Sequence, residues 1–356
     1  MNNKIKEFQK KLVKLKLPLA LIFSTKLKDP AFFYFSNISP EYALMLMSSK
    51  FFPRIYCSSL DFEELKASSR IKPFLQFKKN TLEQIKKLTK THKIKKIGVN
   101  FSYLTVKELK NLKKLFKCKF VDISDELLNL RAIKTNDEIN IYKKACRLTE
   151  QIWSKALAQI QRKKLNTEVQ VKEFIEQQIK LINHAPSFPT IVASGKNAAI
   201  PHHVTNNDKL NGFCIIDFGI RYKGYCTDVT RTIFIGKPTN KEEKFYNLVY
   251  ETKECAANKI SSGEKILNVV KTARKHLGKY DKYFTHGLGH GIGLEIHELP
   301  NLKETSKEKF ENGMIFTIEP GIYFKLKFGI RIEDDYLLER NKLIRLTKAP
   351  KKLVVV

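Results

Sequence analysis

The sequence predicts a mixed α/β (α+β) protein with two domains, residues 1–125 and 126–356. In the first of these, short apolar runs alternate with amphipathic segments, which is typical of a layered, partly parallel sheet. Residues 213–236 hold two β-branched runs joined by a glycine-bounded turn, which predicts a hairpin. The order helix, helix, strands occurs twice, in 137–236 and 241–339, and predicts two related halves packed face to face.

The N-terminal domain is expected to begin with a helix, followed by alternating strands and helices. Strands are predicted at Leu19–Phe23, Ala31–Phe35, Arg54–Cys57, Ile97–Asn100 and Phe120–Ile123, and helices at Thr81–Leu88 and Lys107–Phe116. No histidine, cysteine and acidic residues cluster here with the spacing of metal ligands. We therefore expect a scaffold or assembly domain rather than a second active site.

The second domain is predicted to contain four helices. Thr135 and Glu138 form a capping box that predicts a long helix to about Gln161. Further helices are predicted at Glu168–Ile182, Lys241–Ser261 and Glu264–Leu277, and a loop with a short strand at Ser187–His203. The remaining apolar runs, which include the hairpin, are expected to form the strands of both halves.

The charge is extreme, with a formal value of +30 from 66 basic and 36 acidic residues. Such a surface could attract nucleic acid, an anionic membrane or acidic partners. The lysines, however, are spread over many predicted helix faces and do not gather with aromatic residues. This favours a solvated surface, with no obligatory nucleic-acid partner. Strongly salt-dependent binding of RNA or DNA would support the opposite interpretation.

The six cysteines contain no C-x-x-C pair, which fits reduced thiols in a cytosol. The apolar run near the N-terminus is too short to span a bilayer and lacks a small-residue cleavage site. We therefore expect a cytoplasmic protein without a membrane association.

Two aspartates interrupt the apolar runs of the predicted hairpin, Asp217 and Asp228. A buried carboxylate is unfavourable unless it is paired or binds a metal. Each could be a turn residue or the partner of Arg231 in a buried ion pair. The alternative is that both acids point into one cavity and share metal ions, which requires more ligands further along the chain.

The second half supplies such ligands. His290 and His297 lie in HGLGHGIGLEIHE, and two later strands place Glu319 and Glu333 in apolar settings, with Arg331 on the same face as Glu333. Carboxylates with one imidazole suit Mn, Co, Fe or Zn in paired sites. A hydroxide bridging two such ions could attack a carbonyl, with nearby histidines stabilising the charge on oxygen. The pattern therefore indicates metal-assisted amide hydrolysis.

Five motifs occur in the order found in the pita-bread metallopeptidases: IIDFG, CTDVTR, HGIGLEIHE, TIEPG and RIEDD. With SFPTIVASG, PHH and the RAIK junction, they resemble the branch of aminopeptidase P and prolidase. The resemblance covers about 130–350, and the first 125 residues resemble the creatinase-type N-terminal domain more loosely. It implies such a domain followed by a pita-bread catalytic domain with pseudo-twofold halves.

The resemblance also implies the role of each site residue and two divalent ions, manganese first, with Co, Zn or Fe as alternatives. Asp217 would bind one ion, His290 and Glu319 the other, and Asp228 and Glu333 would bridge both. Glu319 would also accept a proton, His297 would stabilise the tetrahedral intermediate, His202 would lie beside the substrate, and Arg331 would order the carboxylates. The resemblance leaves the choice between His202 and His203 open.

The implied activity is hydrolysis of the bond between an N-terminal residue and a following proline by a metal-bridging hydroxide. Prolidases often have an arginine soon after the His-Glu pair to hold a dipeptide's carboxylate, and here Asn301 follows Pro300. We therefore expect an Xaa-Pro aminopeptidase, with Xaa-Pro dipeptidase (prolidase) as the alternative. A basic nucleic-acid- or peptide-binding protein on this scaffold is the non-enzyme alternative. The expected partners are small peptides with proline second, and a homodimer is expected.

Overall fold

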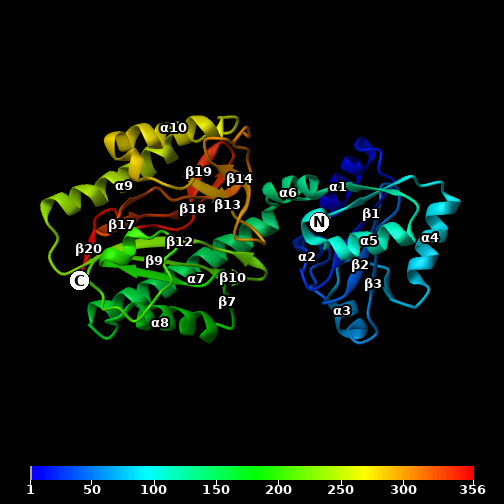
Figure 1. Ribbon diagram of the computed structural model, residues 1–356, viewed down its shortest axis with the longest axis horizontal. Coiled ribbons are helices and arrows are strands. Elements are labelled where there is room, and N and C mark those ends of the chain that lie inside the picture. Colours follow the sequence, from blue (N-terminus) through cyan, green and yellow to red (C-terminus); the bar gives the residue numbers. More distant parts are fainter. Residues whose placement is uncertain (1) are drawn as a thin grey trace. The chain divides into compact units, whose positions relative to one another are not determined.

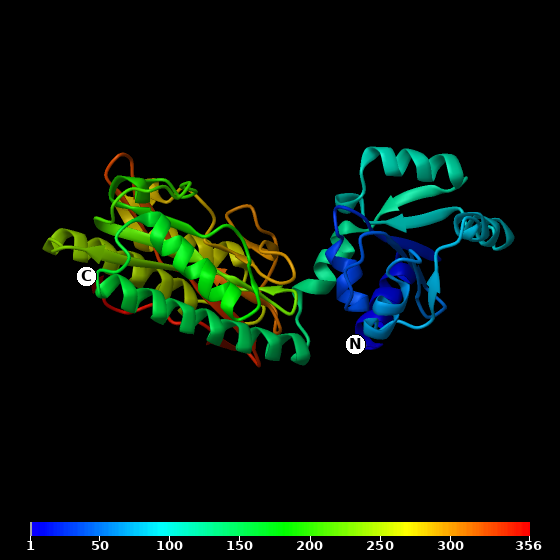
Figure 2. The same ribbon diagram turned by 90° about the horizontal axis from the view of Figure 1, so that it is seen from below.

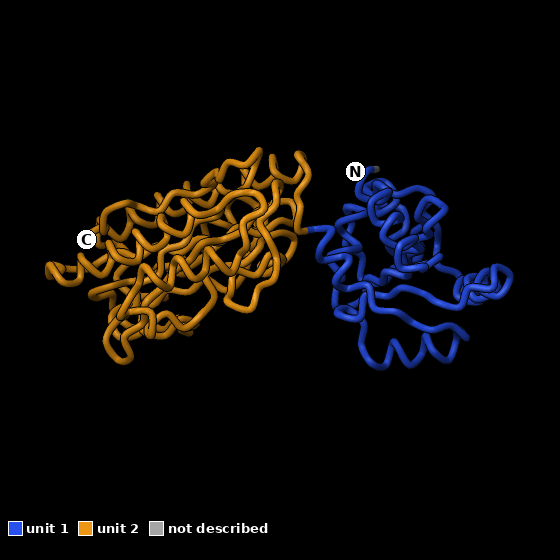
Figure 3. The backbone as a smooth tube through the Cα atoms, turned by 90° about the horizontal axis from the view of Figure 1, so that it is seen from above, with its two compact units in different colours: residues 1–131 blue, residues 132–356 orange. Residues whose placement is uncertain are grey.

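The computed structural model describes residues 2–356. The chain divides into two compact units, residues 1–131 and 132–356 (Figure 3). The boundary between them falls within helix α6 (Ser124–Ala132).

The first unit is built on a six-stranded mixed sheet with the order β4-β3-β2-β1-β5-β6. Strand β1 pairs antiparallel with β2 and parallel with β5. Its strands are β1 (Leu19–Ser24), β2 (Ala43–Ser48), β3 (Arg54–Cys57), β4 (Phe74–Gln76), β5 (Lys96–Val99) and β6 (Lys119–Asp122). Its helices are α1 (Asn2–Lys14), α2 (Pro30–Ser36), α3 (Phe62–Ser68), α4 (Thr81–Thr91), α5 (Val106–Leu115) and α6.

The strand predicted at Ala31–Phe35 is wrong, because this segment lies in helix α2. The Asp29 side chain accepts a hydrogen bond from the Ala31 amide at 2.8 Å and so caps the helix. Pro30 occupies the first turn, where its fixed φ suits a helix. Five aromatic and small residues of the helix are buried, which gave this helix the apolar character of a strand. Strand β2 was not predicted, although it is almost wholly buried.

The second unit contains two halves, each with a pair of helices against a sheet (Figures 1 and 2). In the first half, α7 (Asn136–Gln161) and α8 (Glu168–Leu181) pack on a four-stranded sheet of the order β20-β12-β9-β8. In the second half, α9 (Asn240–Asn258) and α10 (Ile266–Leu277) pack on a five-stranded sheet of the order β14-β13-β15-β18-β19. This arrangement confirms the predicted repetition of helix, helix and strands.

The strands of this unit are mostly short. They are β7 (Ala185–Pro186), β8 (Ile191–Ser194), β9 (Gly212–Phe218), β10 (Ile220–Tyr222), β11 (Tyr225–Cys226), β12 (Val229–Ile235), β13 (Gly289–Gly291), β14 (Glu298–Leu302), β15 (Ile315–Ile318), β16 (Gly321–Phe324), β17 (Phe328–Arg331), β18 (Asp334–Glu339), β19 (Lys342–Arg345) and β20 (Val354–Val355). Strands β7, β10 and β11 form a small third sheet, and β16 pairs with β17.

The capping box at the start of α7 is present, because Thr135 and Glu138 exchange both hydrogen bonds. The predicted hairpin is also present, since β9 and β12 pair antiparallel over their whole length. The connection between them is longer than a turn and contains the small ribbon β10–β11.

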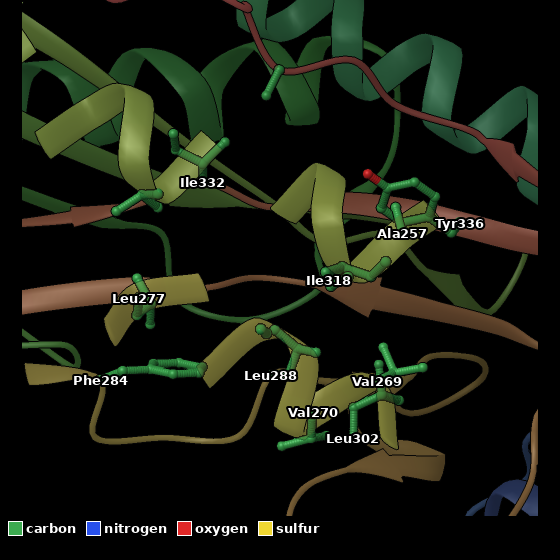
Figure 4. Close-up of a cluster of buried hydrophobic side chains, with 14 of the residues drawn as sticks. Ala257, Val269, Val270, Leu277, Phe284, Leu288, Leu302, Ile318, Ile332 and Tyr336 are labelled. Carbon is green, nitrogen blue, oxygen red and sulfur yellow. The ribbon is translucent and has the colours of Figure 1, made fainter. Parts of the chain in front are cut away.

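The core of the second half lies between its helices and its sheet. Figure 4 shows Val269, Val270 and Leu277 of α10 near Leu288, Leu302 and Ile318. Each of these side chains is at most 2% exposed, so the strands that carry the later candidate residues rest on a closely packed base.

Within residues 2–356, no helix combines the length and the apolar character that crossing a bilayer would require.

Candidate metal centre

All candidate site residues from the sequence line one cavity of about 610 Å³ in the second unit. Asp217 is on β9, and Asp228 directly precedes β12, so the antiparallel pairing of these strands brings both acids to the same end. The other half contributes His290 from β13, His297 from the segment before β14 and Arg331 from the end of β17. The prediction that strands carry Glu319 and Glu333 is wrong, because these residues lie in the connections that follow β15 and β17. The candidates at this cavity are His202, Asp217, Asp228, His290, His297, Glu319, Arg331 and Glu333.

Three of these side chains offer ligand atoms that all lie within 4.8 Å of one another: Asp228, His290 and Glu333. His290 Nε2 is 3.5 Å from Asp228 Oδ2 and 3.5 Å from Glu319 Oε1. His290 Nδ1 lies 3.1 Å from the Gly291 carbonyl oxygen. A proton on Nδ1 donated to that carbonyl leaves the Nε2 lone pair directed at the carboxylates, which is how proteins orient a metal-binding histidine.

The buried carboxylates lack enough partners from the protein. Among residues 2–356, Asp217 Oδ1, Asp228 Oδ1 and Glu333 Oε1 are buried and accept no hydrogen bond. Burial raises the pKa of Asp228 and of Glu333 well above the ordinary values, and neighbouring carboxylates raise them further. Divalent cations would supply the missing partners and compensate the negative charge. The residues therefore fit a metal centre of hard ligands.

Arg231 does not pair with either hairpin aspartate, so the ion-pair interpretation from the sequence is wrong. Its guanidinium lies 3.2 Å from Asp334 and 2.5 Å from Glu150. It also donates to the backbone carbonyl of Glu333 at 2.5 Å. Arg231 thus ties β12 to the segment that carries Glu333.

Arg331 contacts the carboxylates directly. Its Nη2 donates to Asp217 Oδ2 at 2.5 Å, and its Nε donates to Thr230 Oγ1 at 3.1 Å. The Thr230 hydroxyl in turn donates to Glu333 Oε2 at 2.7 Å. The predicted ordering role of Arg331 is consistent with these contacts, because one side chain positions acids from both halves.

The two consecutive histidines before the hairpin have different surroundings. His203 Nε2 lies 2.8 Å from Glu168 Oε2, and both side chains are at most 8% exposed. Glu168 also accepts from the Ser194 amide at 2.7 Å, so His203 belongs to a buried polar cluster. Within the described residues 2–356, His202 has no such ion pair, and it is exposed at the cavity. The geometry therefore favours His202 as the histidine nearest a substrate.

The sequence analysis assigned no role to His286 or Tyr323, which extend the polar network. Arg331 Nη1 donates to Tyr323 Oη at 2.9 Å. His286 Nε2 is 2.8 Å from the same oxygen, and its Nδ1 is 2.8 Å from the Gly287 carbonyl. Burial raises the pKa of Tyr323 to about 12, so the phenol stays protonated and its O–H donates a hydrogen bond to His286 Nε2. The sequence offered one indication of a role for His286, which is its position at the start of the glycine-rich motif HGLGHGIGLEIHE.

His297 lies outside the ligand cluster but next to it. Its ring centroid is 4.4 Å from that of His290, edge to face. Burial and then the neighbouring His290 lower the pKa of His297, so its ring is neutral near pH 7 and keeps one N–H donor. It is exposed at the cavity, where that N–H can reach a bound substrate.

Two further motif residues, Lys134 and Gly291, support the backbone around the cavity. Lys134 of the RAIK junction pairs with Glu298 at 3.6 Å, and both side chains are 1% exposed. At Gly291, a Cβ atom would lie 2.0 Å from the Leu299 carbonyl oxygen, so no other residue fits between β13 and β14. These contacts hold the segments on either side of the metal centre.

We predict that Arg231→Met destabilises the protein by about 3–5 kcal/mol, because it leaves the buried Asp334 carboxylate without one of its cationic partners. Arg147→Met, on an exposed face of α7, is the matched control and should change stability little. Thermal unfolding followed by circular dichroism measures both. Equal melting temperatures for the two variants would contradict the assigned role of Arg231.

Residues 140–340 match the model of metallopeptidase family M24. The chain belongs to this family. Residues 4–133 of this M24 protein match the creatinase/prolidase N-terminal domain, so the fold predicted from the sequence is confirmed. Membership implies divalent metal ions, in agreement with the ligand cluster.

Relatives resemble this M24 protein along nearly its whole length. An Xaa-Pro dipeptidase from Pyrococcus horikoshii is 33% identical and covers 99% of each chain. The crystal structure of the prolidase from that organism superposes with a TM-score of 0.89, at 32% identity, over 99% of this chain and 100% of the other. The X-Pro aminopeptidase from Thermotoga maritima gives a TM-score of 0.87, at 28% identity, over 96% and 98%.

Proposed function

We propose that this metallopeptidase is an Xaa-Pro dipeptidase, which hydrolyses the bond between an amino acid and a C-terminal proline. The observation that carries the proposal is the cluster of Asp228, His290 and Glu333 in the cavity lining, with buried carboxylate oxygens that have no hydrogen-bond partner among residues 2–356. Similarity over the whole chain to proteins named Xaa-Pro dipeptidase and prolidase supports the choice of substrate.

Divalent ions held by Asp217, Asp228, His290, Glu319 and Glu333 would polarise the scissile carbonyl and activate a water molecule. Glu319 is only half-buried and lies beside His290, so it can accept the proton of that water. His297 can donate a hydrogen bond to the oxygen of the carbonyl as it gains charge. Burial raises the pKa of Asp217, and the Arg331 guanidinium opposes this effect and orients the carboxylate.

Xaa-Pro aminopeptidase, the first expectation from the sequence, is the second candidate. Asn301 lies in the cavity wall, where an arginine would favour dipeptides, and the Thermotoga relative named an X-Pro aminopeptidase has the same fold. The named dipeptidases match the chain at higher identity, which is why the order of the two candidates is reversed. Homodimer formation remains a proposal, and light scattering tests it.

The deciding assay compares three substrates at equal concentration: the dipeptide Leu-Pro, the tripeptide Leu-Pro-Gly and the proline-free dipeptide Leu-Ala. A dipeptidase should hydrolyse Leu-Pro fastest. Faster release of leucine from Leu-Pro-Gly would favour the aminopeptidase. Equal rates for Leu-Pro and Leu-Ala would refute both.

Each assay is run after chelation and after addition of Mn²⁺, Co²⁺, Zn²⁺ or Fe²⁺, with Mn²⁺ proposed first. Activity should disappear with the chelator and return with a divalent ion, because the carboxylate set is otherwise uncompensated. Full activity in the chelator, with no metal by elemental analysis, would exclude a metal-dependent peptidase.

A further inference from the structure

One buried carboxylate, that of Glu168 at the start of α8, holds the loop that follows β8. Its Oε1 accepts hydrogen bonds from the Ser194 amide at 2.7 Å and from Asn197 Nδ2 at 3.0 Å. Its Oε2 accepts from His203 Nε2 at 2.8 Å and from the Asn206 amide at 3.3 Å. All four donors lie in the segment that contains the two consecutive histidines, so one side chain gathers this whole segment against α8.

Hydrogen bonds matter in this loop because it has little apolar packing. The structure describes every residue from 200 to 209, and none of them is buried. The two aliphatic side chains of this stretch, Ile200 and Val204, are 52% and 83% exposed. A surface segment of this kind opens locally at a low free energy once its polar contacts are lost.

His202 lies between two anchored neighbours. On its N-terminal side, the Pro201 carbonyl accepts a hydrogen bond from Arg331 Nη1 at 3.3 Å. Arg331 is also the side chain that orients Asp217, so this anchor belongs to the metal centre. On the C-terminal side, the anchor is the contact of the His203 side chain with α8. His202 itself is exposed at the cavity, so its placement depends on the residues next to it.

We propose that His203 and Glu168 are positioning residues, which hold His202 beside a bound substrate and so raise the affinity of the site for that substrate. The inference deepens the proposed function and rests on it, because it takes His202 as the histidine nearest the substrate. His203 reaches the cavity wall, but its Nε2 is directed at Glu168, so it acts through its neighbour.

The expected effect follows from the population of the loop. If loss of the contact leaves the loop in place for only about a tenth of the time, the apparent affinity for the substrate falls about tenfold. Bound substrate selects the ordered loop, so turnover at saturation should change little. The signature of positioning is therefore a change in KM without a matching change in kcat.

The test uses the manganese-loaded, full-length protein with Leu-Pro as substrate. His203→Met removes the donor, whereas the amide of His203→Gln can replace it, and the shorter amide of His203→Asn cannot reach Glu168. Each variant is made in the wild-type protein and in a His202→Ala background. The matched control is His276→Met, because His276 is an exposed histidine of α10 at 4.0 Å from Glu251.

Hydrogen–deuterium exchange of the backbone amides, followed by mass spectrometry, gives a readout that does not depend on turnover. His203→Met and His203→Asn should raise KM for Leu-Pro roughly tenfold and speed exchange in residues 200–208 by about the same factor. His203→Gln and His276→Met should keep wild-type values. In the His202→Ala background, His203→Met should raise KM no further, because no histidine is left for it to position.

A further tenfold rise of KM in the His202→Ala background would overturn the proposal, since His203 would then act independently of His202. An unchanged KM in His203→Met and His203→Asn would overturn it too, as would faster exchange throughout the protein in both variants, which marks a general loss of stability. Failure of the proposed function looks different, because wild-type protein would then hydrolyse Leu-Pro no faster than Leu-Ala. The exchange data would in that event still decide whether the contact of His203 with Glu168 holds the loop.

Discussion

Asp228→Asn should lose at least about 100-fold in metal affinity and nearly all peptidase activity. Asp228 shares the cluster of ligand atoms with His290 and Glu333, and we propose that it bridges both ions. The amide keeps the shape of the side chain but cannot supply the anionic oxygen that hard divalent ions prefer. Metal content by elemental analysis and kcat/KM on Leu-Pro are the measurements.

The same variant should behave differently when no metal is present. Burial and the neighbouring carboxylates raise the pKa of Asp228, which means that its ionised form is destabilised in the folded protein. A neutral amide removes that repulsion, so metal-free Asp228→Asn should be at least as heat-stable as metal-free wild type. Metal addition should then raise the melting temperature of wild type but not of the variant.

Asp281→Asn is the matched control, because the Asp281 side chain lies far from the ligand cluster in sequence and forms a partly exposed pair with Arg274 at 2.9 Å. It should keep its metal and its activity. An Asp228→Asn protein that retains full metal content would refute the ligand role of Asp228. If the metal-free variant instead unfolds at a much lower temperature than metal-free wild type, Asp228 has a chiefly structural role.

His297→Ala should lower kcat on Leu-Pro on the order of 10²–10³-fold with unchanged metal content. His297 lies against His290 but outside the cluster of ligand atoms, so its removal takes a hydrogen-bond donor and no metal ligand. A donor that acts as charge develops on the carbonyl oxygen stabilises the transition state more than the bound substrate. KM should therefore change much less than kcat.

His290→Ala is the comparison for this experiment. It removes the imidazole of the ligand cluster and should lose metal, with activity falling as a consequence. Metal stoichiometry and kcat are measured for both variants. Equal metal loss in the two proteins would refute the distinction between them, and near wild-type kcat in His297→Ala would leave His297 as a packing residue.

The fold class and the candidate residues followed from local patterns. The capping box at Thr135 and the paired runs around Asp217 and Asp228 each depend on neighbours a few residues apart. Carboxylates in or beside apolar runs are costly enough to bury that they stand out without a structure. The apolar run Ala31–Phe35 is compatible with a strand or a buried helix, and the predicted strand was wrong. The Asp29 side chain caps this segment, which forms a helix.

By itself, the sequence determined that this chain has two domains of mixed α/β type, that the second repeats a helix, helix and strand pattern, and that it carries an ordered set of acids and histidines. Only the tertiary structure decided which partners these residues have. Arg331, not Arg231, pairs with Asp217, and His203 is occupied by Glu168 while His202 faces the cavity. The reason is physical: partners separated by 35 to 114 residues are selected by strand register and by packing within and between the halves, and these leave no periodic signal along the chain.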